Sequence, residues 1–229
     1  MSKDETKNLL LLAAEKLFVK KGYDAVSTRE LAEEAGVNLA AIQYHFGSKA
    51  KLFVEALHRM MAGGACCRGR EILEGTVESK EEAAKKITLF VYNFLNTILR
   101  PKGINPFRLV FREILSHTVS DKEMFEALVS STVENFTRPT QNALNILLKV
   151  LAPNLSDQEL SRTTASVAGQ CSFYLTHQPF LERLSKENYK DEHTIRDITQ
   201  HISSFTFRAL GLDEKFIKKA ILDAFEEIQ

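Results

Sequence analysis

The chain has 229 residues, 44% of them hydrophobic and only five of them proline, so it is long enough to bury one large or two small hydrophobic cores. Thirty basic side chains balance thirty acidic ones, which excludes a polycation that binds nucleic acid through bulk charge alone. An apolar run at residues 9–14 is too short for a signal peptide or a membrane span. We therefore expect a cytoplasmic protein without a membrane partner.

Neither the cysteines nor any known catalytic motif identifies a function for this sequence. Three cysteines cannot all pair, which argues against a disulfide framework. Cys66 and Cys67 are neighbours, and such a pair either senses thiols or soft metals or has no role beyond packing. The sequence contains no P-loop, G-x-G-x-x-G, G-x-S-x-G, H-E-x-x-H or C-x-x-C motif. We expect no catalytic residues, no cofactor and no metal site.

The first predicted helix follows a polar leader, Met1–Thr6, which we expect to be mobile. The helix runs to about Lys21 and ends at Gly22. Its inner side is formed by apolar residues at helical spacing, namely Leu10, Ala14, Leu17 and Phe18.

Residues 27–51 place two short helices and the start of a third in a stretch too small to be a domain alone. Ser27 and Glu30 have the S-x-x-E spacing of a capping box, so a helix should begin there. Gly36 allows the chain to leave that helix through a left-handed residue. Asn38 is placed to cap a second helix. This order is typical of a helix-turn-helix.

The second helix of this motif has a narrow apolar side, formed by Ile42 and Phe46. A helix of this kind can lie in the major groove and read base edges. The alternatives are a helical hairpin inside an ordinary α-domain, or an interaction module that binds protein through the same face. The outward residues are Leu39, Ala40, Gln43, Tyr44 and His45.

A set of short motifs recurs at fixed offsets between Leu10 and Leu57: Ala13-Ala14, Leu17-Phe18, Gly22-Tyr23, Leu31-Ala32, Ala35-Gly36-Val37, Tyr44-His45-Phe46 and Lys49. This stretch resembles the N-terminal domain of the TetR family of transcriptional regulators. Many members have a tyrosine at the position of Gln43. Because a glutamine can pair with adenine N6 and N7, the operator sequence cannot be carried over.

The resemblance implies which side chains meet DNA. We expect Thr28 and Lys49 to anchor phosphates. The other residues expected at the DNA surface are Arg29, Asn38, Leu39, Ala40, Gln43, Tyr44 and His45. Binding by one such head would be weak, so the resemblance also implies a homodimer with two heads in successive major grooves.

The rest of the chain also reads as helical, without strand-like alternation. The predicted domains are a DNA-binding domain at 1–50, a connecting helix at 51–77 with a hinge at Gly63 and Gly64, and a helical ligand-binding and dimerisation domain at 78–229. The predicted fold class is therefore all-α, a three-helix head followed by a larger helical body. Within the body, S-x-x-E starts occur at Ser79, Ser120 and Ser156, and Pro139 should kink or split a helix.

Two long segments of the body repeat apolar or small residues at alternating three- and four-residue intervals, as helices that cross at a shallow angle do. We predict that they form the dimer interface, although the same pattern also suits the chain's own core. The residues are Leu160, Thr164, Val167, Ile195, Ile198, Ile202, Phe205 and Ala209.

The resemblance implies a small-molecule inducer held between helices of the body. Aromatic side chains would line such a cavity, and Arg112 and His177 would orient the ligand, although phenylalanines at helical spacing also suit a plain core. The predicted ligand-binding residues are Phe90, Phe94, Phe111, Arg112, Cys171, Phe173, Tyr174 and His177.

The interpretation that explains most of the sequence is a ligand-responsive regulator of transcription. We expect a repressor that binds a palindromic DNA operator as a dimer and is released by its inducer. The alternatives are an all-helical protein-interaction module without DNA binding and an enzyme that carries no recognisable motif.

Overall fold

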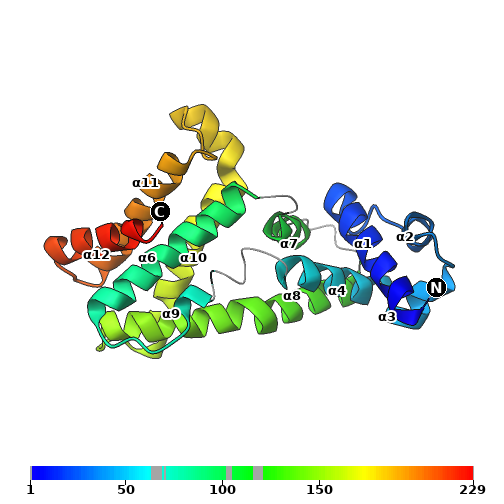
Figure 1. The fold of residues 1–229 in the computed structure, drawn as a ribbon, viewed down its shortest axis with the longest axis horizontal. Helices are drawn as coiled ribbons and strands as arrows, with labels where there is room; N and C mark the ends of the chain where they lie inside the picture. Colours follow the sequence, from blue (N-terminus) through cyan, green and yellow to red (C-terminus); the bar gives the residue numbers. More distant parts are fainter. Residues whose placement is uncertain (1, 63–68, 70, 102–104, 116–120, 229) are drawn as a thin grey trace. The chain divides into compact units, whose positions relative to one another are not determined.

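The computed structural model describes residues 2–62, 69, 71–101, 105–115 and 121–228. Within these ranges every regular element is helical, which confirms the predicted all-α fold class (Figure 1). No helix in the described ranges has the length and apolar character that crossing a bilayer requires. The chain divides into two compact units, Met1–Gly64 with Gly103–Phe136, and Ala65–Lys102 with Thr137–Gln229.

The first unit opens with the predicted helix-turn-helix head. The leader is shorter than expected, because the Ser2 side chain accepts a hydrogen bond from the Glu5 N–H and starts a helix at once. The predicted glycine at the end of the second helix is confirmed, since Gly36 has φ +65° and ψ +33°. The four helices of the head are α1 (Lys3–Lys21), α2 (Thr28–Ala35), α3 (Ala40–Phe46) and α4 (Lys49–Ala62).

An aromatic cluster forms the centre of the head. The ring of Phe53 meets those of Phe18 and Tyr23 edge-on, with centroids 5.0 and 5.3 Å apart. All three side chains are buried. Because they come from α1, the loop after it and α4, they hold α1 against α4 and leave α2 and α3 on the outside of that pair.

Two further helices pack on the head, so the boundary predicted at residue 78 does not describe the first unit. These are α7 (Pro106–Leu115), which contacts α1 and α4, and α8 (Lys122–Thr132), which contacts α4. Their inner sides bury Leu109, Val110, Met124 and Leu128. The side chain of Asp121 caps α8 by accepting from the Met124 N–H; the predicted cap, Ser120, lies outside the described residues.

Pro139 divides a long helical stretch, as predicted. A π-helical turn, η1 (Val133–Thr137), follows α8, and α9 (Arg138–Leu151) begins immediately afterwards. A proline has no N–H to donate to the carbonyl four residues earlier, and its ring crowds that carbonyl. The wider turn just before Pro139 avoids both problems.

The second unit is built around one helix, α6 (Lys80–Leu99), which contacts all four of its other long helices (Figure 1). Its apolar side contributes Ile87, Val91, Leu95 and Ile98 to the core. The surrounding helices are α9, α10 (Asp157–Ser185), α11 (Glu192–Ala209) and α12 (Glu214–Glu226).

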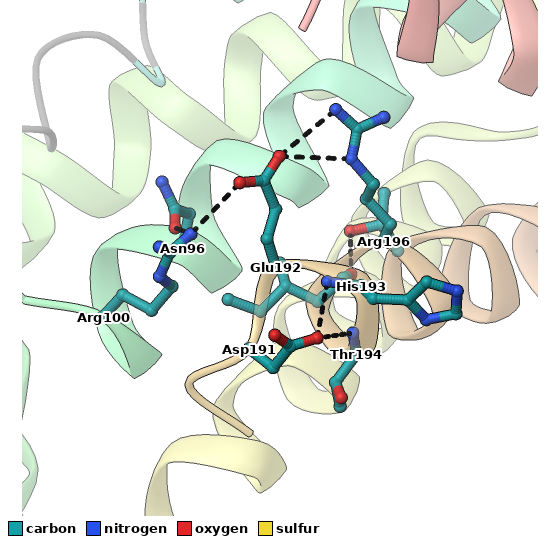
Figure 2. Close-up of polar contacts among 9 residues, drawn as sticks. Asn96, Arg100, Asp191, Glu192, His193, Thr194 and Arg196 are labelled. Carbon is teal, nitrogen blue, oxygen red and sulfur yellow. Dashed lines mark hydrogen bonds and ion pairs between the residues drawn. The ribbon is translucent and has the colours of Figure 1, made fainter. Parts of the chain in front are cut away.

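Charged side chains join α6 to the start of α11 (Figure 2). Glu192 accepts from the Arg196 Nη2 at 3.3 Å and pairs with Arg100 at the end of α6 at 3.7 Å. Asp191 caps α11 by accepting from the N–H groups of His193 and Thr194. Ion pairs exposed to this degree contribute little to stability.

The structure describes part of the predicted connecting helix and does not include its predicted hinge. Gly63 and Gly64 lie outside the described residues, as do Cys66 and Cys67. Of the connecting helix predicted at 51–77, the structure describes helix through Ala62 and at residues 69 and 71–73.

Gly36 offers a test of the turn between α2 and α3. A Cβ at this position would meet no atom within 4 Å, so any effect of substitution comes from the left-handed backbone. We expect Gly36→Ala to lower the free energy of unfolding by about 1 kcal/mol, and Gly36→Asn by less, because Asn tolerates this conformation. Urea unfolding of both variants measures the difference. Equal stability of Gly36→Ala and the wild type would contradict this explanation of the turn.

Candidate nucleic-acid interface

The outer face of α3 is as open as the sequence predicts. Ile42 and Phe46 are 3% and 6% exposed, whereas Leu39 and Tyr44 are 45% and 70% exposed. Ala40 and Gln43 are also exposed. A seven-residue helix that buries one narrow side and exposes an aliphatic, an amide and a phenol group is suited to contact with base edges.

Neighbouring residues extend this face. Arg29 is exposed in the first turn of α2, and Thr28 beside it is half-buried. Asn38 is exposed, and its Oδ1 accepts from the Ala40 N–H at 2.9 Å at the start of α3, although the N-cap residue is Leu39, one position later than predicted. The half-buried ring of His45 meets the Tyr44 ring edge-on, with centroids 4.9 Å apart.

One cation near this face, Lys3, was not predicted from the sequence. Lys3, at the start of α1, places its Nζ 5.3 Å from the centroid of the Tyr44 ring. The contact exists because α1 packs against α3. No local motif signals it, since the two residues are far apart in the sequence.

Lys49 has a different position from the one predicted. Its side chain is half-buried, and its Nζ lies 3.9 Å from the centroid of the Tyr23 ring. Burial lowers the pKa of the Lys49 ammonium, while the nearby carboxylates of Asp24, Asp121 and Glu113 oppose that shift. In this arrangement the ammonium is directed to the ring and not to a phosphate.

Two family models match the chain. One, described as "Bacterial regulatory proteins, tetR family", matches residues 10–56. The other, described as "HTH-type transcriptional dual regulator CecR, C-terminal domain", matches residues 83–210, which is more than half of the chain. The chain belongs to the TetR family of transcriptional regulators. Membership of the TetR family favours the regulator among the three classes that the sequence left open.

The relatives differ in how much of their length they share with this TetR-family chain. The repressor NicS of Pseudomonas putida is 22% identical over 90% of this chain and 93% of NicS. The dual regulator CecR of Shigella flexneri is 30% identical over 59% of this chain and 63% of CecR. The activator FasR of Mycolicibacterium smegmatis is 30% identical, but over only 39% of this chain and 41% of FasR.

Solved structures have the same fold. A transcriptional regulator from Pseudomonas aeruginosa PAO1 has a TM-score of 0.63 at 14% identity, covering 92% of this chain and 96% of that one. FadR from Bacillus subtilis, in complex with stearoyl-CoA, has a TM-score of 0.59 at 14% identity, covering 86% and 97%. At such identities the likeness establishes the fold alone.

The structure corrects the predicted role of Arg112. Its guanidinium donates to the backbone carbonyls of Phe18 and Val19 at 2.6 and 3.1 Å, and to the Glu113 carboxylate at 3.1 Å. These carbonyls lie in the last turn of α1, where a cation interacts favourably with the helix dipole, and the Phe18 carbonyl also accepts from the Gly22 N–H at 2.8 Å. Arg112 therefore binds the end of α1 within the first unit and is not directed at a ligand.

The other predicted ligand residues are divided between the two units. Phe111 belongs to the first unit, and the remaining six to the second. Phe90 is buried and stacks on the half-buried Phe94, and burial raises the pKa of the Cys171 thiol to about 12. By contrast, Phe173 and His177 are exposed and stack on each other at 4.3 Å on the outer face of α10, and Tyr174 is half-buried beside Tyr189. An open groove lined by residues of α11 and α12, including Gln200, Arg208 and Leu222, contains none of the predicted residues.

The predicted dimer seam also requires correction. Six of its eight residues are buried inside this chain and therefore cannot be the surface offered to a second copy: Leu160, Thr164, Val167, Ile195, Ile198 and Ile202. Only Phe205 and Ala209 are exposed. The periodicity is real, but its partners are the neighbouring helices of the same unit.

The contacts of Arg112 predict a structural effect. We expect Arg112→Met to lower the free energy of unfolding by about 2 kcal/mol, because the buried Glu113 carboxylate loses its cation and α1 loses a charged cap. Arg112→Lys keeps the charge but loses the planar guanidinium, so its free energy of unfolding should lie between those of Arg112→Met and the wild type. Urea unfolding measures all three proteins. Unchanged stability of Arg112→Met would restore a role for Arg112 outside the fold.

Proposed function

We propose that this chain is a transcriptional repressor that acts in the cytoplasm, binds a palindromic operator as a homodimer and is released by a small-molecule ligand. The observation that carries the proposal is the exposed outer face of α3, with Leu39, Gln43 and Tyr44 available to base edges. Two such heads would occupy successive major grooves about 34–36 Å apart.

We favour repression over activation because the alignment with a known repressor covers more of that protein than the alignment with a known activator does. The alignment with the repressor NicS covers 93% of that protein, whereas the alignment with the activator FasR covers 41%. The comparison supports a repressor as the first hypothesis, to be tested on the native operator.

Ligand response is supported by the family and by one structural neighbour. FadR of Bacillus subtilis was solved in complex with stearoyl-CoA. For this chain we propose a small molecule with an apolar portion, bound among the helices of the second unit near the stacked rings of Phe90 and Phe94. Such a ligand relieves repression only if it binds more tightly to the conformation that does not fit the operator.

The proposed dimer uses the face of α10 opposite its buried side. This face carries Gly169, where a Cβ would meet no atom within 4 Å, and the exposed side chains of Phe180 and Leu184. A glycine in the middle of a helix costs stability within one chain, but it lets a second helix approach closely. We define the α10 outer stripe as Ala165, Gly169, Phe173, His177, Phe180 and Leu184.

DNA binding is tested with a labelled pool of random duplexes titrated at about 50 and 200 mM salt. We expect salt-dependent binding that weakens in Arg29→Ala, with the slope of log K against log salt reduced by about 1.8, the value of one phosphate contact in each of the two heads. Arg183→Ala, at an exposed position near the end of α10, is the matched control and should leave the slope unchanged. Selection from the same pool should yield a near-palindrome. Absence of binding at low salt would contradict the proposed function, and a single asymmetric site would contradict the dimer.

The dimer is tested at Gly169. We expect Gly169→Met to weaken dimerisation by about tenfold or more, because two bulky side chains meet where the helices approach. The same change should leave the fold of each chain intact or more stable, since a helical glycine is replaced. Ala168→Met, one residue away on the flank of the helix, is the control. Sedimentation equilibrium measures the association, and a Gly169→Met protein that still dimerises normally would show that the α10 outer stripe is not the interface.

A further inference from the structure

Hydrogen bonds tie the head to α7 and to the start of α8 within the first unit. The backbone N–H of Tyr23 donates to Glu113 at 3.3 Å, and its hydroxyl donates to Asp121 at 2.5 Å. The hydroxyl of Ser48, just before α4, donates to Glu123 at 3.2 Å. These contacts join residues that are at least 75 positions apart in the chain.

Lys49 lies in the middle of these contacts. Its ammonium sits over the face of the Tyr23 ring, which attracts a cation. Asp24, Glu113 and Asp121, named here the acidic cluster, supply negative charge around it. The ammonium is therefore held by groups on the protein side, although its helix begins directly after the recognition helix.

Asp121 connects this arrangement to α8. One of its oxygens accepts from the Met124 N–H at 3.0 Å and caps α8, and the other accepts from the Tyr23 hydroxyl. A displacement of the first turn of α8 would therefore move the carboxylate that orients Tyr23 under Lys49. Asp121 and Tyr23 thus link the start of α8 to Lys49, the first residue of the helix that follows α3.

We infer that Asp121 is a positioning residue for DNA binding: through Tyr23 it holds Lys49 on the acidic cluster in the free protein, and Lys49 contacts the DNA backbone only after leaving that site. The inference rests on the proposed function. In this inference the acidic cluster of the protein and a DNA phosphate compete for the Lys49 ammonium. Any ligand effect that reaches α8 would then change the number of phosphate contacts as well as the placement of the head.

The first test is a double-mutant cycle on binding to the random duplex pool. Asp121→Asn removes the charge and keeps one acceptor oxygen for the α8 cap, while its NH2 group replaces the oxygen that accepts from Tyr23 and can only donate to that hydroxyl. We expect it to bind more tightly than the wild type, with a salt slope steeper by up to about 1.8, as one added phosphate contact in each of the two heads would give. In a Lys49→Ala background the gain should disappear. Glu33→Gln, on the exposed side of α2, removes a similar charge and is the control whose effect should survive Lys49→Ala.

The second test needs no DNA. Lysine labelling by reductive methylation, followed by peptide mass spectrometry, measures the accessibility of Lys49. We expect faster labelling of Lys49 in Asp121→Asn, and also in Tyr23→Phe, which keeps the ring but loses the hydroxyl bond to Asp121. The labelling of Lys3 should stay constant in both variants.

The outcomes separate this inference from the proposed function. If the wild type binds no duplex while Lys49 labelling rises in Asp121→Asn and Tyr23→Phe, the proposed function is wrong. The contacts that hold Lys49 in the free protein are then still supported. If the wild type binds but Asp121→Asn changes neither the slope nor the labelling, Asp121 is only a helix cap and the inference is overturned. A gain that persists in the Lys49→Ala background also overturns it, because the charge would then act without Lys49.

Discussion

The burial of two side chains determines where the recognition surface points. A helix of seven residues, as α3 is, does not persist in water by itself, so tertiary contacts set its orientation. Ile42 and Phe46 occupy one side of α3 and are buried against the rest of the head. Leu39, Gln43 and Tyr44 must then face outward. The proposed DNA-reading face, which is the outer face of α3, thus depends on apolar packing, and the head needs no large excess of positive charge to form it.

Tyr23 has a comparable role on the other side of the head. Its ring completes the aromatic cluster with Phe18 and Phe53, and its two polar groups donate to Glu113 and Asp121. A buried aromatic residue with a satisfied hydroxyl is both a packing and a positioning element. Because α7 and α8 supply the acceptors, the compact unit that contains the DNA-reading face includes helices that follow it by more than forty residues.

The helix α10 illustrates how one amphipathic pattern serves two neighbours. Its inner side, with Leu160 and Val167, packs inside the second unit. Its outer stripe combines a glycine in open space with apolar side chains near its end, Phe180 and Leu184. Apolar area left open on a regulator of the TetR family is what a second copy would cover. The proposed dimer therefore still uses α10, but through the side of the helix opposite to the one that the sequence predicted.

The sequence by itself determined the features that depend on near neighbours in the chain. The cap at Ser27, the Asn38 hydrogen bond at the start of α3, the left-handed Gly36, the break at Pro139 and the narrow apolar side of α3 all follow from local sterics and hydrogen bonding, and these sufficed to predict the all-α class and the outward face. Only the tertiary structure decided which partner each side chain has. Arg112 is bound to the carbonyls of α1, Lys49 lies over Tyr23, and the 3-4 seams of α10 and α11 face their own core. The physical reason is that the helical period identifies the residues on one side of a helix but not the surface against which that side packs. A helix of the same chain and a helix of a second copy offer the same kind of apolar contact, so the sequence pattern cannot distinguish them.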